Sequence, residues 1–282
     1  MIEVGSAVAH ARVGQRVIVP WAVSCGQCDR CRRGLTSKCA TTTERTLAAF
    51  GFGQASGPWG GMIADAVRVP YADHMLVPVP DAVPSLRVAA ASDNLADAWR
   101  SVVAPLAERP GGSVLILGGG AKSIGLYAAG LAVAHGASVV AYVDPNPARR
   151  AIAEEFGAGA RPPKTTLSGR YNVVVEATSS ASGLREAVRA LAPGGVCTAV
   201  GYYLSSGTRV PLMHMYATDA TLRLGVSHAR AILPDLLSFI ERSGFPAERV
   251  TTTTADWQDA PRAYGDRTTK LALQRDPLTA DR

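Results

Sequence analysis

Several features that would define the class of a protein are absent from this sequence of 282 residues. No uncharged apolar run approaches the roughly 18 residues that cross a bilayer, and the first residues, MIEVGSAVAHARVG, have neither the basic nor the apolar part of a signal peptide. Internal repeats and low-complexity linkers are absent as well. These absences argue against a membrane-spanning or repeat protein, and we expect a soluble, cytoplasmic one with no membrane partner.

A concentrated excess of one charge is also missing. Lys and Arg total 29 against 23 for Asp and Glu, a formal charge of +6, and the basic residues are scattered except between Arg30 and Lys38. A nucleic-acid partner is therefore not required. With 47% hydrophobic and 18% charged residues, the chain can bury a sizeable core, and its length suits two domains.

The hydrophobic pattern changes along the chain. Up to about residue 85, short alternating segments lie between turn residues, at 13–20, 63–70 and 75–78, which predicts an irregular, β-rich region. From Leu86, all-apolar strand patterns such as SVLILGGG and NVVVEAT alternate with helical ones. Strands without polar alternation are buried on both faces, so we predict an α/β fold with a doubly wound parallel sheet. Near the end, AILPDLLSFIERSG predicts an amphipathic helix, and a short strand is expected at 270–274.

Four cysteines give the strongest single signal. They occur in CGQCDRCRRGLTSKC and are Cys25, Cys28, Cys31 and Cys39. Thiolates at this spacing can turn toward one point, and four sulfurs complete the tetrahedral shell of a structural zinc ion with no open position. Two disulfides are the alternative, but nothing marks the chain as secreted, so we expect zinc, with its negative charge screened by the neighbouring basic residues. Cys197, in the apolar stretch VCTAV, is expected in the core.

A glycine-rich turn, GGGAKSIG, follows the first apolar strand and leads into a helix. This arrangement presents glycine backbone and free helix amides to the diphosphate of a dinucleotide. The spacing departs from G-x-G-x-x-G, because the third glycine comes two residues late. The residues expected to contact the cofactor here are Gly118, Gly120, Ser123, Ile124 and Gly125.

A carboxylate, Asp144, ends the second strand, roughly 20 residues after Gly125. A carboxylate at this place accepts hydrogen bonds from both hydroxyls of the adenosine ribose and repels a 2′-phosphate, so we predict NAD rather than NADP. The alternative is a turn residue, because Pro145 follows and Asn146-Pro147 suits the start of the next helix.

The order of these features resembles the zinc-dependent alcohol dehydrogenases of the medium-chain dehydrogenase/reductase superfamily. The stretches that carry the resemblance include VGSAVAHARVGQRVIVP, CGQCDRC with Cys39, GGMIADAVRVPYADHMLVPVPD, ASDNLADAW, the glycine turn, LAPGGVCTAVGYY and TTKLAL. The resemblance implies a partial GroES-like β domain at 1–88, an NAD-binding Rossmann domain at 89–224 and a return segment at 225–282 that packs on the first domain.

The resemblance also implies roles for single residues. Lys270 would contact the cofactor pyrophosphate and Arg149 would lie beside the adenine, although a solvated surface position is the alternative for both. The backbone around Gly201 would lie under the nicotinamide. The family further implies a small alcohol or aldehyde as substrate and a homo-oligomer, either a dimer or a tetramer.

The family's catalytic zinc site is not matched in full. It takes a Cys near the N-terminus, a His in a Gly-His-Glu motif and a later residue, which is a carboxylate in the threonine dehydrogenase-like and formaldehyde dehydrogenase-like branches. Only the last has a counterpart, Asp93, and it alone cannot hold a catalytic zinc. Its alternative role is to cap a helix at 95–103. No cysteine precedes Cys25, and the five histidines align with other positions.

Two explanations remain open for the missing ligands: a misassigned start or fragment, and a naturally short protein. We favour the first, because a β lobe without its first strands would leave unpaired edges and uncovered apolar faces near 17–19.

Two functions are compatible with these features. The first is a zinc-dependent oxidoreductase that moves hydride between NAD and an alcohol or aldehyde, catalytically incomplete in the sequence as it stands. The second is a non-catalytic protein that binds NAD and structural zinc. A zinc ribbon that binds nucleic acid is poorly supported, because no aromatic platform interleaves with the basic residues.

Overall fold

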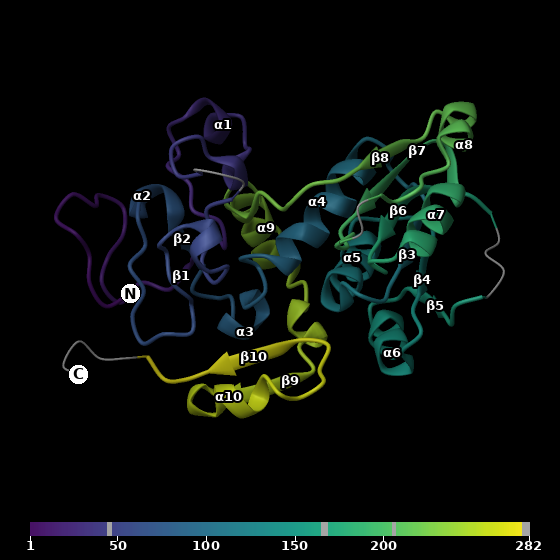
Figure 1. The fold of residues 1–282 in the computed structure, drawn as a ribbon. Coiled ribbons are helices and arrows are strands. Elements are labelled where there is room, and N and C mark those ends of the chain that lie inside the picture. Colours follow the sequence, from purple (N-terminus) through teal and green to yellow (C-terminus); the bar gives the residue numbers. More distant parts are fainter. Residues whose placement is uncertain (44–46, 165–168, 205–206, 278–282) are drawn as a thin grey trace.

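The structure is a computed structural model, and it describes residues 1–43, 47–164, 169–204 and 207–277 (Figure 1). Its largest feature is a six-stranded sheet in the order β5-β4-β3-β6-β7-β8, in which every neighbouring pair is parallel. The strands are β3 (Val114–Leu117), β4 (Val140–Val143), β5 (Gly159–Arg161), β6 (Tyr171–Glu176), β7 (Leu191–Ala199) and β8 (Thr221–Arg223).

Helices cover both faces of this sheet. Alternate residues of β3 enter separate cores: Val114 and Ile116 pack with Leu126 on one face, whereas Leu115 and Leu117 pack with Ala187 on the other. The predicted doubly wound parallel sheet is therefore confirmed, and burial of both faces explains the all-apolar strands. The helices of this region are α4 (Asn94–Ala107), α5 (Lys122–Ala134), α6 (Pro147–Glu155), α7 (Ala181–Arg189) and α8 (Leu212–Thr218). Helix α9 (Ala229–Ser243) packs on α4 and on the first part of the chain.

The helix ends follow local sequence signals. Asn146 accepts a hydrogen bond from the Arg149 amide at the start of α6, and Ser180 caps α7 through the Gly183 amide. Helix α9 ends before Gly244, whose φ of 65° is the left-handed conformation that terminates helices. In the described residues, no helix is both long and apolar enough to span a membrane.

Residues 1–88, which we call the first lobe, contain little regular structure. Strands β1 and β2 pair antiparallel over two residues each. Residues 63–70 form no strand, contrary to the prediction, because no other segment within the described residues pairs with them. The elements of the lobe are β1 (Val17–Ile18), α1 (Asp29–Arg32), η1 (Thr36–Lys38), η2 (Gln54–Ser56), α2 (Ala72–Met75), β2 (Val77–Pro78) and α3 (Ser85–Val88).

The segment from residue 225 onward returns to the first lobe (Figure 1). Trp21 donates to the Ser227 hydroxyl over 3.0 Å, and Arg87 pairs with Glu248 over 2.6 Å. These contacts fit the expected return segment, while the domain limits themselves stay a prediction. The expected C-terminal strand is present as β10, which pairs with β9 in parallel. The elements after α9 are η3 (Ala247–Val250), β9 (Thr253–Asp256), η4 (Trp257–Asp259), α10 (Ala260–Ala263) and β10 (Leu271–Gln274).

Candidate functional site

The four cysteines of the first lobe converge on one point. Their Sγ atoms all lie within 4.8 Å of one another. Cys28 Sγ lies 3.9 Å from Cys39 Sγ, close to the edge of about 3.8 Å that a tetrahedron with zinc–sulfur bonds of about 2.3 Å requires. All five cysteines are free thiols, so the disulfide alternative is wrong for this structure, and Cys197 is buried in the core as expected.

Backbone amides surround the sulfurs. The amides of Cys25, Cys28 and Ala40 each donate to a sulfur of the cluster over 3.4 Å. Burial raises the pKa of Cys39, but hydrogen bonds from Thr42 and from the Cys25 amide outweigh it and bring the pKa to about 6. Zinc binds the thiolate, so these donors favour the protonation state that the metal needs. The donor set and its spacing therefore fit a structural zinc ion.

The glycine turn lies between β3 and α5 and is anchored on its neighbours. The Gly118 amide donates to Val143 over 2.7 Å, and the Gly120 amide donates to Thr178 over 3.2 Å. These bonds place the turn at the carboxyl edge of the sheet, beside the loop that follows β6. In α/β proteins this edge is the place where ligands bind.

Helix α5 begins with amides that have no partner. The backbone N–H groups of Lys122, Ser123 and Ile124 find no acceptor within the described residues. Lys270 lies beside them, because its Nζ donates to Asn94 Oδ1 over 2.6 Å and the Ser123 hydroxyl donates to the same oxygen over 3.3 Å. Free amides, a helix dipole and a lysine suit an anionic group such as a diphosphate. A dinucleotide therefore fits these residues.

Asp144 and Arg149 form a buried ion pair at the end of β4. The Asp144 carboxylate is fully buried and accepts from Arg149 Nε and Nη2 over 2.8 and 2.7 Å, from the Tyr142 hydroxyl and from the Asn146 amide. Four donors fill the acceptor sites of a carboxylate. The solvated alternative for Arg149 is wrong, because this side chain is buried. Recognition of the ribose by Asp144 stays a prediction, and it requires Arg149 to release the carboxylate.

Asp93 stands at the N-cap position of α4, but its side chain makes no capping hydrogen bond. The carboxylate accepts only from Asn94, over 3.1 Å, among the residues that the structure describes. The surrounding protein displaces part of the solvent around the Asp93 carboxylate and so raises its pKa, although the residue is still exposed. The charge of Lys270 opposes this shift. Across the described ranges, the cysteine cluster is the one group of three or more potential metal ligands. A ligand role for Asp93 stays a prediction.

Asp97 and Arg100, one turn further along α4, were not identified from the sequence. Burial raises the pKa of Asp97 to about 6, and the hydrogen-bonded Arg100 opposes that rise. Arg100 also donates to the Gly225 carbonyl over 2.7 Å, where the chain turns back toward the first lobe. The i, i+3 spacing of an acid and a base in ASDNLADAWR was the available signal.

Glu176, at the end of β6, was missed as well. This carboxylate is fully buried and accepts from the Thr178 amide over 2.8 Å and from the hydroxyls of Thr178 and Tyr203. It therefore fixes the turn after β6 and the chain after β7, where Gly201 lies. A charged residue ending the apolar strand NVVVE was the signal in the sequence.

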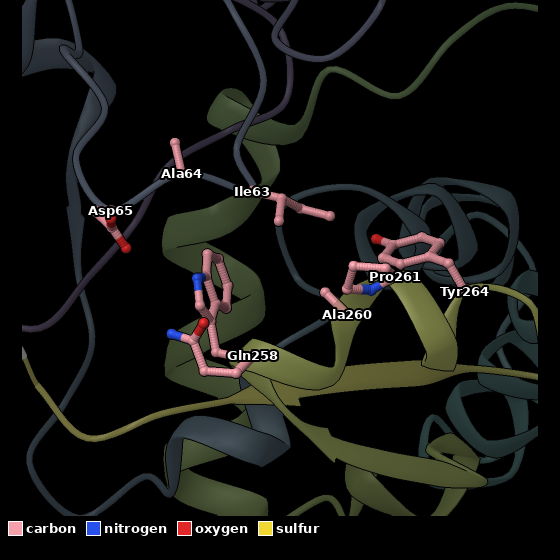
Figure 2. A pocket seen from close by; sticks show the side chains of 8 residues that line it. Ile63, Ala64, Asp65, Gln258, Ala260, Pro261 and Tyr264 are labelled. Atoms are coloured by element: carbon pink, nitrogen blue, oxygen red, sulfur yellow. The ribbon is translucent and has the colours of Figure 1, made fainter.

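A separate hollow of about 530 Å³ lies between residues 63–65 and the return segment (Figure 2). Its wall includes Trp257, over which the Arg275 guanidinium stacks at 4.3 Å while pairing with Asp65 over 2.6 Å. None of the cofactor or metal residues predicted from the sequence lines it. The lining residues are Ile63, Ala64, Asp65, Trp257, Gln258, Ala260, Pro261 and Tyr264.

Two family models match the chain. Residues 1–81 match the alcohol dehydrogenase GroES-like domain, and residues 123–242 match the zinc-binding dehydrogenase model. A probable zinc-binding alcohol dehydrogenase of Mycobacterium tuberculosis is 28% identical over 278 residues, which cover 94% of this chain and 68% of that protein.

Two further similarities extend this picture. A glutathione-independent formaldehyde dehydrogenase of Pseudomonas aeruginosa is 36% identical over 162 residues, 56% of this chain and 40% of that protein. The solved structure of an alcohol dehydrogenase from Thermus sp. ATN1 superimposes with a TM-score of 0.87 at 26% identity, covering 96% of this chain and 81% of that one.

Proposed function

Because the chain belongs to the zinc-dependent alcohol dehydrogenase family of the medium-chain dehydrogenase/reductase superfamily, we propose that it is an oxidoreductase that binds NAD and one structural zinc ion. The observation that carries this proposal is the start of α5, where unpartnered amides lie beside Lys270 at the carboxyl edge of a parallel sheet. A small alcohol or aldehyde is the substrate class that the family supports.

The residues of the chain would share the work of binding the cofactor. The amides of Lys122, Ser123 and Ile124 would hold the diphosphate, and Lys270 would neutralise part of its charge. When bound, NAD supplies the hydride acceptor at its nicotinamide ring. Gly201 would lie under that ring, and its close approach to Ser179 leaves no room for a Cβ atom at this position.

The cysteine cluster would have a separate task. Four thiolates around zinc leave no open coordination position, so this site would hold the fold of the first lobe and take no part in the reaction. Asp93 alone cannot hold a catalytic zinc, and no Cys or His of the described residues joins it in a metal-binding group, so no step is assigned to a catalytic metal.

The second candidate function is a non-catalytic protein that binds NAD and structural zinc. It is favoured by one observation: in the described part of the chain, no His or Cys accompanies Asp93 in a metal-binding group. The two candidates share the cofactor and the cysteine site and differ in turnover alone.

One experiment separates them. The purified chain is titrated with NADH by isothermal calorimetry, its zinc content is measured, and it is assayed against a panel of alcohols with NAD⁺ and of aldehydes with NADH. Turnover supports the oxidoreductase and contradicts the second candidate. NADH binding with one zinc per chain and no turnover is what the second candidate predicts and means that this chain by itself does not catalyse the reaction, and failure to bind NADH contradicts both.

We extend the proposal to the organisation of the protein. The domain limits 1–88, 89–224 and 225–282 and a dimeric or tetrameric assembly are proposed from the family resemblance, and a cytoplasmic location is proposed as the sequence led us to expect. Limited proteolysis tests the domain limits, and cell fractionation tests the location. Light scattering on the purified protein tests the assembly.

A further inference from the structure

One residue of the turn after β6 has an unusual backbone. Ser179 has a φ of 59°, in the left-handed region that glycine adopts freely and that a residue with a Cβ atom adopts at a cost. Serine also lacks the short carboxyl or amide group that makes Asn and Asp tolerable there. Strained backbone conformations are concentrated at functional sites, so this one points to a functional role for Ser179.

The side chain of Ser179 lies between two glycines. A Cβ atom on Gly120 would stand 2.6 Å from Ser179 Oγ, and one on Gly201 would stand 2.7 Å from the same atom. Glycine is required at both positions for the serine to fit. Gly120 belongs to the turn that leads into α5, and Gly201 follows β7, so the hydroxyl stands between the two backbone segments that border the proposed cofactor site.

Neighbouring groups hold this turn in place. The hydroxyl of Thr178 is bonded to Glu176 and to Ser180, and Ser180 Oγ accepts from the Gly183 amide at the start of α7. The Gly120 amide donates to the Thr178 carbonyl and ties the turn to the glycine loop. The strain at Ser179 is therefore imposed by partners on both sides of it.

The Ser179 hydroxyl itself is not used by the fold. Within the ranges that the structure describes, it has no hydrogen-bond partner, in contrast to the hydroxyls of Thr178 and Ser180 on either side. The side chain is partly exposed, so solvent or a ligand can reach it. A hydroxyl that is held in a costly conformation and left unpaired is suited to binding something outside the fold.

We propose that Ser179 is a further cofactor-binding residue, whose hydroxyl donates a hydrogen bond to a diphosphate oxygen of the bound dinucleotide. This inference rests on the proposed function. The diphosphate is the group assigned because the free amides of α5 start two residues after Gly120, the glycine against which the Ser179 hydroxyl lies. A hydrogen bond to a charged oxygen is among the stronger ones in proteins.

The experiment compares Ser179→Ala and Ser179→Gly with the wild-type chain. NADH affinity is measured by calorimetry and thermal stability by scanning fluorimetry. Both variants lose the hydroxyl, so both should bind NADH about 10-fold more weakly or worse. Only the glycine variant relieves the backbone, so it alone should raise Tm, by about 1–3 °C.

Asp219→Gly is the matched control. Asp219 also has a left-handed backbone, with a φ of 49°, but it ends α8, outside the proposed cofactor site. Its glycine variant should leave NADH affinity unchanged and raise Tm by less than Ser179→Gly does, because Asp is tolerated in this conformation. Titration with ADP-ribose, which keeps the diphosphate and lacks the nicotinamide, should show the same loss in both Ser179 variants.

Two results would overturn the inference. NADH affinity within twofold of wild type in Ser179→Gly would make the serine a strained turn residue only. A loss seen with NADH but not with ADP-ribose would place the contact on the nicotinamide half and contradict the assignment to the diphosphate. Failure of the wild-type chain to bind NADH is a different outcome, because it contradicts the proposed function itself.

Discussion

The six-stranded sheet and the first lobe are held together in different ways. In the sheet, Val114, Leu115 and Ile116 are fully buried, and each strand between the edges pairs on both sides. In the first lobe, β1 and β2 pair over two residues each, and Ile63 remains 51% exposed in a segment without a strand partner. The sheet is therefore a self-sufficient scaffold, whereas the first lobe depends on the cysteine cluster and on contacts with the return segment.

Removal of the metal should separate the two regions most strongly. Cys39→Ser should abolish zinc binding and unfold the first lobe at a cost well above about 3 kcal/mol, because structural zinc contributes roughly 10 kcal/mol or more in small zinc peptides. The parallel sheet should keep its structure. Amide hydrogen exchange checks this, with lost protection expected at 17–43 and unchanged protection in β3 and β6.

Cys197→Ala is the control for loss of a thiol without loss of metal. Cys197 is buried in the sheet core and lies outside the cysteine cluster. Zinc content should stay at one ion per chain in this variant. Protection that disappears throughout the chain in Cys39→Ser would contradict the independence of the sheet.

The buried ion pair of the sheet region gives the next largest effect. Asp144→Ala should leave the buried Arg149 guanidinium without its partner and destabilise the chain by about 3 kcal/mol. The ribose hypothesis adds that affinity for NADH should fall more than affinity for NADPH. Urea unfolding and parallel titrations with both cofactors measure the two effects.

Arg149→Met distinguishes the two roles of Asp144. It removes the cation and frees the carboxylate oxygens that the guanidinium now occupies. Ribose recognition by Asp144 predicts that NADH affinity survives this change or improves. Equal weakening of NADH and NADPH in Asp144→Ala would leave Asp144 with a structural role alone.

Acid should affect the first lobe through His74, with a smaller effect. Burial, helped by the charge of Arg230, lowers the pKa of His74 to about 4 from an ordinary value near 6.5. The unfolded chain therefore takes up the proton as pH falls below 6.5 while the folded lobe does not, so stability drops between pH 6.5 and pH 4. We expect a loss on the order of 1–2 kcal/mol across this window.

His74→Gln tests this pH dependence. The amide can keep the contact that His74 Nε2 makes with Ser24 Oγ over 3.0 Å, but it does not titrate. The urea midpoint of the variant should fall less than that of wild type between pH 7 and pH 4.5. An identical fall in both proteins would assign the acid sensitivity to other groups.

The same contrast explains how far the sequence predicts the structure. Strands such as Val114–Leu117 are all apolar because both faces are covered, and this leaves a pattern that can be read without coordinates. Residues 63–70 show alternation, but a strand also needs a neighbour to pair with, and that depends on the rest of the fold. The spacing of the four cysteines was enough to predict that they cluster, because only short stretches of chain separate them.

The parts of the site that were missed depend on tertiary burial. The five-residue interval between Asp144 and Arg149 is equally compatible with a solvated arginine and with the buried pair that forms. The left-handed backbone of Ser179 arises from Glu176 and Thr178 on one side and from Gly120 on the other. No local sequence pattern predicts such a residue, because segments that are distant in the sequence impose its strain.

The central claim is that the carboxyl edge of the sheet, together with Lys270 of the return segment, forms a dinucleotide site. Hydrogen exchange of the full chain with and without saturating NADH tests it most directly. We predict added protection at 118–125 and 176–180, with the cysteine segment 25–39 unchanged. NADH-dependent protection confined to the first lobe, or none anywhere in the chain, would contradict the claim.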